Sequence, residues 1–173
     1  MILKVFKEKS IKKRINKLLS ERIVKSDNTV AKTLGVLVNV DEFNDLAAFE
    51  KLAKDFKIQP INLKIIGFSG DKKNEPHGID TCYYLEDFSR NGQVKNIELQ
   101  SFLDEDFDIL INYYAEDILE LKLLSVLSKA KFKIGTLQLD ERINDLIIKI
   151  ELKDFKVFKT ELFKYLTILN KIN

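Results

Sequence analysis

Residues 34–173 show two kinds of hydrophobic pattern, which follow one another in turn along the chain. Continuous apolar runs are typical of strands covered on both faces, and they predict strands at 34–40, 63–68, 82–85, 107–113, 131–135 and 145–150. Between them, apolar residues recur at spacings of three and four, which predicts amphipathic helices at 43–56, 97–103, 119–130 and 155–169. This alternation predicts an α/β fold: a Rossmann-like, mostly parallel sheet with helices on both faces.

A basic amphipathic helix is predicted ahead of the sheet. Ser10 is expected to be its N-cap, and one apolar stripe then contains Ile11, Ile15, Leu18, Leu19 and Ile23. The polar stretch at 26–29 interrupts this pattern and predicts a linker or turn. We therefore expect a helix or arm at residues 1–28 and a single α/β domain at residues 29–173.

The charge of the chain is concentrated at its start. Nine cations against two acids give residues 1–25 a charge of +7, whereas the whole chain carries +2. This asymmetry predicts an anionic partner, RNA or the ribosome before a membrane surface, bound by Lys12, Lys13, Arg14 and Lys17. Two alternatives remain open. The lysines could be a solvated face of a helix that packs on the sheet, or the helix could pack on a second copy of itself.

Several classes of function are disfavoured by what the sequence lacks. A single cysteine, Cys82, excludes an intramolecular disulfide framework, and its expected place in a strand argues against thiol catalysis. Neither Gly-x-Gly-x-x-Gly after the first strand nor a Walker-type Gly-Lys-Ser/Thr is present, so no cofactor is expected. The first residues contain no signal-like apolar run and no segment is long enough to span a bilayer. We expect a cytoplasmic protein.

A second candidate site follows from the predicted sheet. In open α/β sheets, ligands bind outside the carboxyl ends of the strands. The polar residues expected there, which could line a small-molecule cleft, are Asn39, Asp41, Ser69, Asn112 and Tyr114. Asp41 would be the general base of such a cleft and the others would orient the ligand. The alternative is that these residues are ordinary caps and turns.

Two other groups of residues give weaker signals. The acidic residues of segment 104–108 resemble a hard-cation site, but they precede a strand and so predict a solvated entrance to it. His77 is the only histidine, and it lies in the long polar loop expected at 69–80. The sequence therefore favours no metal site.

The segments Phe107–Tyr113 and Leu124–Gly135, with the Asp-Leu-Ile-Ile run that follows them, carry a resemblance. From about residue 30 to its end, the chain resembles a family of uncharacterised small flavobacterial (Bacteroidetes) proteins. That resemblance implies a fold and a lineage but no reaction. The same stretch is similar, more loosely, to the N-terminal half of heptosyltransferase-like glycosyltransferases, which implies only a shared Rossmann-like fold.

Together these observations favour a non-enzymatic binding or adaptor protein that contacts an anionic partner through its N-terminal helix. The alternative is a small-molecule-binding or transferase-like protein that uses the cleft at the strand ends.

Overall fold

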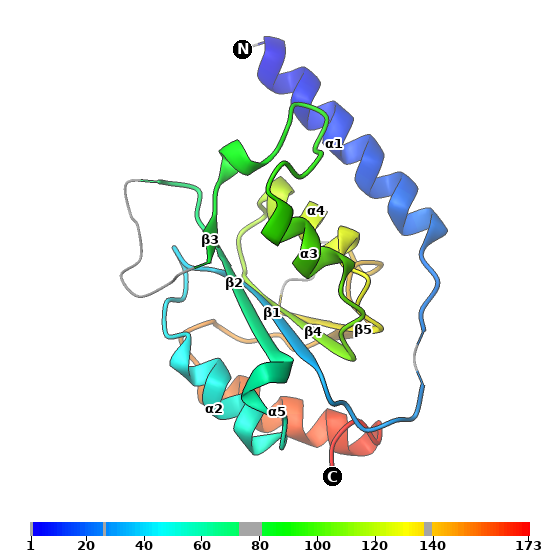
Figure 1. Cartoon of the computed structure of the whole chain (residues 1–173), viewed down its shortest axis with the longest axis vertical. Helices are drawn as coiled ribbons and strands as arrows, with labels where there is room; N and C mark the ends of the chain where they lie inside the picture. Colours follow the sequence, from blue (N-terminus) through cyan, green and yellow to red (C-terminus); the bar gives the residue numbers. More distant parts are fainter. Residues whose placement is uncertain (1, 26, 73–80, 137–139) are drawn as a thin grey trace.

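The computed structural model describes residues 2–25, 27–72, 81–136 and 140–173 (Figure 1). In these ranges one sheet contains β1 (Leu34–Asn39), β2 (Leu63–Phe68), β3 (Cys82–Tyr83), β4 (Ile109–Tyr113), β5 (Phe132–Gly135) and β6 (Leu146–Ile147). The strand order is β3-β2-β1-β4-β5-β6, and every neighbouring pair is parallel. This is the order of a Rossmann-like sheet, so the predicted fold class is confirmed.

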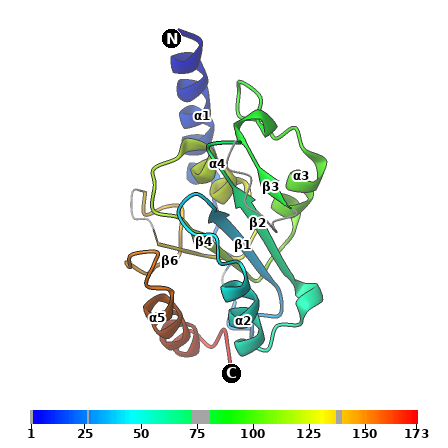
Figure 2. The same ribbon diagram turned by 90° about the vertical axis from the view of Figure 1, so that its left-hand side faces the viewer.

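Helices cover both faces of the sheet (Figures 1 and 2). Helices α2 (Ala47–Asp55) and α5 (Phe155–Ile168) pack on one face, and the other is covered by α1 (Ile2–Glu21), α3 (Ile97–Asp104) and α4 (Leu119–Leu127). Two short 3₁₀ helices, η1 (Pro60–Asn62) and η2 (Leu85–Asp87), lie in the connections beside β2 and β3. The hydrophobic core is therefore two layers separated by the sheet.

The central strand β1 shows why a continuous apolar run marks this fold. Val36 and Val38 pack in the layer under α2 and α5, whereas Leu37 packs in the layer under α1, α3 and α4. Successive side chains of a strand point to opposite faces, so a strand covered on both faces needs apolar residues at consecutive positions. Gly35 is required for a different reason, since a Cβ there would lie 2.8 Å from the ring of Phe107.

The predicted start of α1 is wrong. The helix begins at Ile2, so Ser10 lies in its interior and caps nothing. No glycine or proline interrupts residues 2–21, and the lysines and leucines there are good helix formers. The helix ends at Glu21, which leaves Ile23 82% exposed and outside the apolar stripe.

Helix α1 is docked on the body of the protein. Ile11, Ile15 and Leu19 are at most 6% exposed and share one hydrophobic cluster with Leu123 of α4 and Phe68 of β2. The N-terminal turns of the helix extend beyond the sheet (Figure 2). The stripe predicted from the sequence is thus mostly buried, and the helix presents its remaining side chains to solvent.

Candidate functional site

Three of the predicted cleft residues come together at the ends of β1 and β2. The Asp41 carboxylate accepts hydrogen bonds from Ser69 Oγ at 2.7 Å and from the Gly70 amide at 2.8 Å. Asn39 is buried, and its Oδ1 accepts from the Asp41 amide at 3.2 Å. These side chains hold one another and the two strand-end loops in place.

Sequence reasoning missed Glu42, which lies at the centre of the sheet edge. One of its carboxylate oxygens accepts from Asn39 Nδ2 at 2.9 Å and from the Ala115 amide at 3.0 Å, and the other accepts from the Glu116 amide at 3.1 Å. Glu42 thereby links the loop after β1 to the loop after β4. Its place directly after the first strand was visible in the sequence, but its partners follow from the strand order, which was not.

The other two predicted cleft residues belong to a separate, buried network. Asn112 donates from Nδ2 to Asn144 Oδ1 at 2.7 Å and accepts from Ser125 Oγ at 3.0 Å. The hydroxyl of Tyr114 lies 2.8 Å from the same Ser125 oxygen, and burial raises the pKa of this tyrosine well above its usual value. The five residues therefore form two hydrogen-bonded groups rather than one continuous rim.

The four cations predicted to bind an anionic partner also divide. Lys12, Lys13 and Lys17 are exposed, whereas Arg14 is half-buried and donates from Nη1 to the Gly92 carbonyl at 2.6 Å. At about 100° per residue, Lys12 falls next to the buried stripe and lines a cavity beneath the helix, whereas Lys13 and Lys17 fall on the opposite, outer side. Lys9, which the prediction omitted, shares this outer side.

We define the outer face of α1 as Phe6, Lys9, Lys13 and Lys17, together with Lys12 at its edge beside the cavity. Phe6 is 65% exposed, and the four lysines are exposed as well. None of these lysines forms an ion pair with any residue that the structure describes. The two acids of the helix lie off this face, because Glu8 turns toward a cavity beneath the helix and Glu21 lies at the helix end.

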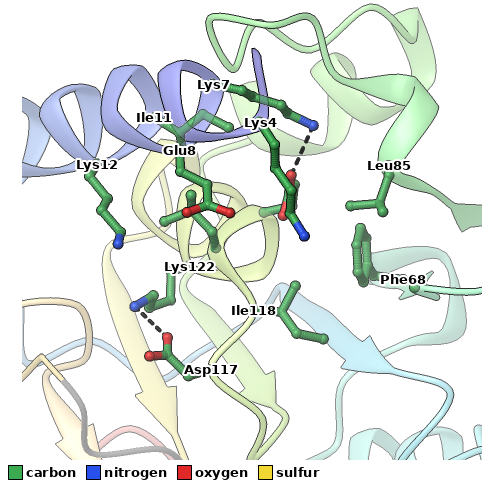
Figure 3. Close-up of a pocket in the computed structure, with 13 residues that line it drawn as sticks. Lys4, Lys7, Glu8, Ile11, Lys12, Phe68, Leu85, Asp117, Ile118 and Lys122 are labelled. Carbon is green, nitrogen blue, oxygen red and sulfur yellow. Dashed lines mark ion pairs between the residues drawn. The ribbon is translucent and has the colours of Figure 1, made fainter. Parts of the chain in front are cut away.

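That cavity, of about 640 Å³, lies between α1 and the carboxyl ends of the strands (Figure 3). Its walls come from α1, from the end of β2, from η2 and from the start of α4. The charged residues that line it are Lys4, Lys7, Glu8, Lys12, Asp117, Glu120 and Lys122. Lys7 pairs with Glu120 at 3.0 Å, and Lys122 pairs with Asp117. An apolar wall is provided by Phe68, Leu85, Ile118 and Leu119.

The described part of the chain has neither a cluster of metal ligands nor a membrane-spanning helix. It contains no group of three or more His, Cys, Asp or Glu side chains able to hold a metal ion. None of its helices is at once long enough and apolar enough to cross a bilayer. Burial raises the pKa of the Cys82 thiol, which disfavours a thiolate there. His77 lies outside the described residues.

Comparison with known proteins identifies a family. A family model described as a family of unknown function, DUF6913, matches residues 7–169. The chain belongs to this family. The match includes most of α1 together with the sheet and its helices, so the helix is part of what the DUF6913 model describes. No curated protein and no solved structure gives a significant match.

Proposed function

We propose that this DUF6913 protein is a non-enzymatic binding protein that contacts single-stranded RNA, alone or in the ribosome, through the outer face of α1. The observation that carries the proposal is the combination of four exposed lysines that form no ion pair with any described residue and the absence of any acid among the residues of this face. Lysines in such an array neutralise successive phosphates, and the release of counterions drives binding. Arg14 is left out because its guanidinium is bonded to Gly92.

The burial of the apolar stripe favours RNA over a membrane surface. A helix that lies in a membrane interface inserts its apolar side chains among the lipids. Here Ile11, Ile15 and Leu19 are already packed against the body of the protein, so they are not available to lipid. What remains outside is chiefly cationic, which suits a polyanion whose charges lie at its surface.

Phe6 gives the outer face an aromatic ring in addition to its lysines. Its ring is 65% exposed and lies between lysines on the same side of the helix. Unpaired bases stack on exposed aromatic rings, whereas the bases of a duplex are stacked on one another. The exposed ring therefore supports single-stranded over double-stranded RNA.

The test is a fluorescence anisotropy titration of the full chain against a labelled oligouridine of about 20 nucleotides. Four lysine–phosphate contacts predict a slope near −3 in a plot of log affinity against log salt. The variant K9E/K12E/K13E/K17E should lose at least about 100-fold in affinity at low salt, because it replaces attraction with repulsion. Glutamate is also a good helix former, so α1 should persist.

The matched control reverses four other exposed lysines that form no ion pair in the described part of the chain, K32E/K51E/K149E/K156E. It changes the net charge by the same amount and should retain most of the affinity. Equal losses in the two variants would contradict a specific face. So would binding to anionic vesicles without binding to RNA. F6A should weaken binding roughly tenfold without changing the salt slope, and F6Y should restore it.

The small-molecule alternative has less support at the residues first predicted for it. Asn39, Asp41 and Ser69 bond to one another and to Glu42, while Asn112 and Tyr114 are bonded within the core. The flavobacterial lineage, the looser likeness to heptosyltransferase-like enzymes and a cytoplasmic location stay predictions.

A further inference from the structure

We propose that the cavity beneath α1 binds a small organic phosphate, of the size and chemistry of a nucleoside diphosphate. This cavity is distinct from the outer face of α1, except that Lys12 borders both. It lies on the inner side of the same helix, at the carboxyl ends of β2 and β4, where sheets of this topology bind their ligands. A volume of about 640 Å³ suits a ligand of this size.

The charges in the cavity are arranged to leave cations available. Glu120 and Asp117 are already neutralised by Lys7 and Lys122. Lys4 and Lys12 form no ion pair within the described residues, and Lys4 points into the cavity (Figure 3). The phosphate groups of a ligand would therefore find ammonium groups at the α1 side of the cavity.

The start of α4 adds hydrogen-bond donors on the opposite side. The helix has no side-chain N-cap, because Ile118 occupies the capping position. The first amide groups of α4 thus have no side chain that accepts their hydrogen bonds. This end of the helix lines the cavity. A phosphate oxygen is a suitable acceptor for such amides, and the helix dipole favours negative charge there.

The remaining lining suits the other half of a nucleotide. Leu85, Ile118 and Phe68 provide an apolar wall against which a planar ring can pack (Figure 3). Glu8 points into the cavity from α1 without an ion pair among the described residues, so its carboxylate can accept hydrogen bonds from ligand hydroxyls. An inorganic anion alone would leave this wall and Glu8 unused.

The experiment is a titration of the isotopically labelled full chain with ADP, followed by amide chemical shifts. We expect saturable shifts at Gly70, Leu85 and residues 118–120. Pyrophosphate and adenosine should each bind more weakly than ADP, because each fills one half of the cavity. Absence of saturable shifts, or shifts confined to the outer face of α1, would overturn the proposal.

Two cavity variants with matched controls locate the site. K4E reverses a charge in the cavity and should weaken ADP binding roughly tenfold, whereas K9E on the outer face of the same helix should not. L85W should block the cavity by bulk, whereas I97W, at a residue 86% exposed on α3, should leave ADP binding unchanged. Controls that weaken ADP binding as much as the cavity variants would also overturn the proposal. RNA affinity is measured in a separate titration. The ADP-binding proposal and the RNA-binding proposal can therefore fail independently of one another.

Discussion

The Arg14 guanidinium donates a hydrogen bond from Nη1 to the Gly92 carbonyl at 2.6 Å, and this bond ties α1 to the turn that precedes α3. The turn is closed by a bond from the Gly92 amide to the Ser89 carbonyl at 3.0 Å. Gly92 has φ +77°, and a Cβ there would lie 3.0 Å from side-chain atoms of both Ile11 and Leu123. The turn that contains Gly92 thus packs against the contact between α1 and α4, which we call the α1–α4 seam.

Gly92→Ala should therefore destabilise the protein by about 1–3 kcal/mol, through an unfavourable positive φ and crowding of the α1–α4 seam. Urea denaturation followed by circular dichroism measures the change. Gly70→Ala is the control, because the nearest atom to its added Cβ is 3.7 Å away and no positive φ is required. Similar losses in the two variants would show that the seam has no special role.

Glu42→Ala should loosen the join between the loops after β1 and β4. The variant removes the acceptor of the Ala115 and Glu116 amides, so these amides should exchange with deuterium faster while the amides of β1 and β4 stay protected. Glu50→Ala, at an exposed position on α2, should leave the exchange unchanged. Unaltered exchange of residues 115 and 116 would mean that Glu42 does not hold the loops together.

Asp108 joins the entrances of β1 and β4. It accepts from the Lys32 amide at 2.8 Å and from Lys131 Nζ at 2.7 Å. Burial raises the pKa of this carboxyl, but the Lys131 ammonium and the backbone amides outweigh burial, so the pKa lies below its ordinary value. Asp108 was expected to be a solvated residue, and its partial burial corrects that expectation.

Because the folded-state pKa of Asp108 is lowered, its carboxylate stabilises the folded protein above the unfolded pKa of about 3.9. This stabilisation is lost as the pH falls through the folded-state pKa. Asp108→Asn should lower the free energy of unfolding by about 2 kcal/mol near pH 6. The difference from the wild type should shrink as the pH of a urea titration is lowered toward 3. Asp106→Asn, at an exposed position, is the control and should leave the free energy of unfolding near pH 6 almost unchanged. A difference independent of pH would rule out the ionised carboxylate as its source.

Lys133 is buried in β5 at 2% exposure, and its ammonium donates to the Ser125 carbonyl at 2.7 Å, in the last turn of α4. Burial, with a smaller contribution from Arg22, lowers the pKa of Lys133 to about 7, whereas nearby Asp145 acts in the opposite direction. Between this value and the unfolded pKa of about 10.4, the unfolded chain binds more protons, so stability rises with pH.

Wild-type stability relative to Lys133→Met should therefore increase by about 1.5 kcal/mol from pH 7 to pH 8.5. Chemical denaturation of both proteins at the two pH values gives the difference directly. The methionine variant also removes the donor to the Ser125 carbonyl, which affects both pH values alike. A constant difference, or one that falls with pH, would contradict the lowered pKa.

The sheet was predictable because each strand covered on both faces must be apolar at successive positions, as β1 is at residues 36–38. Lys133 interrupts such a run in β5, yet its strand was still recognised from Phe132 and Ile134. That its ammonium caps α4 was not predictable, since the contact depends on where α4 ends against the sheet.

The site was less predictable than the fold. Asn39, Asp41 and Ser69 were expected at strand ends, and they do meet because β1 and β2 are neighbours. Asn112 and Tyr114 were placed with them by the same rule, but the direction of each side chain depends on packing against α4. The early start of α1 hid Lys4 and Phe6 from the sequence prediction, because Ser10 was expected to begin the helix.

The measurement that tests the central claim most directly is sedimentation of the tagged full chain from a cell lysate through a sucrose gradient, at low and high salt and with and without RNase. RNA binding by the outer face of α1 predicts that the protein migrates with heavy RNA particles, that salt and RNase each release it, and that K9E/K12E/K13E/K17E migrates as a free small protein. Migration of the wild type as a free small protein under every condition, or migration of the variant with the particles, would contradict it.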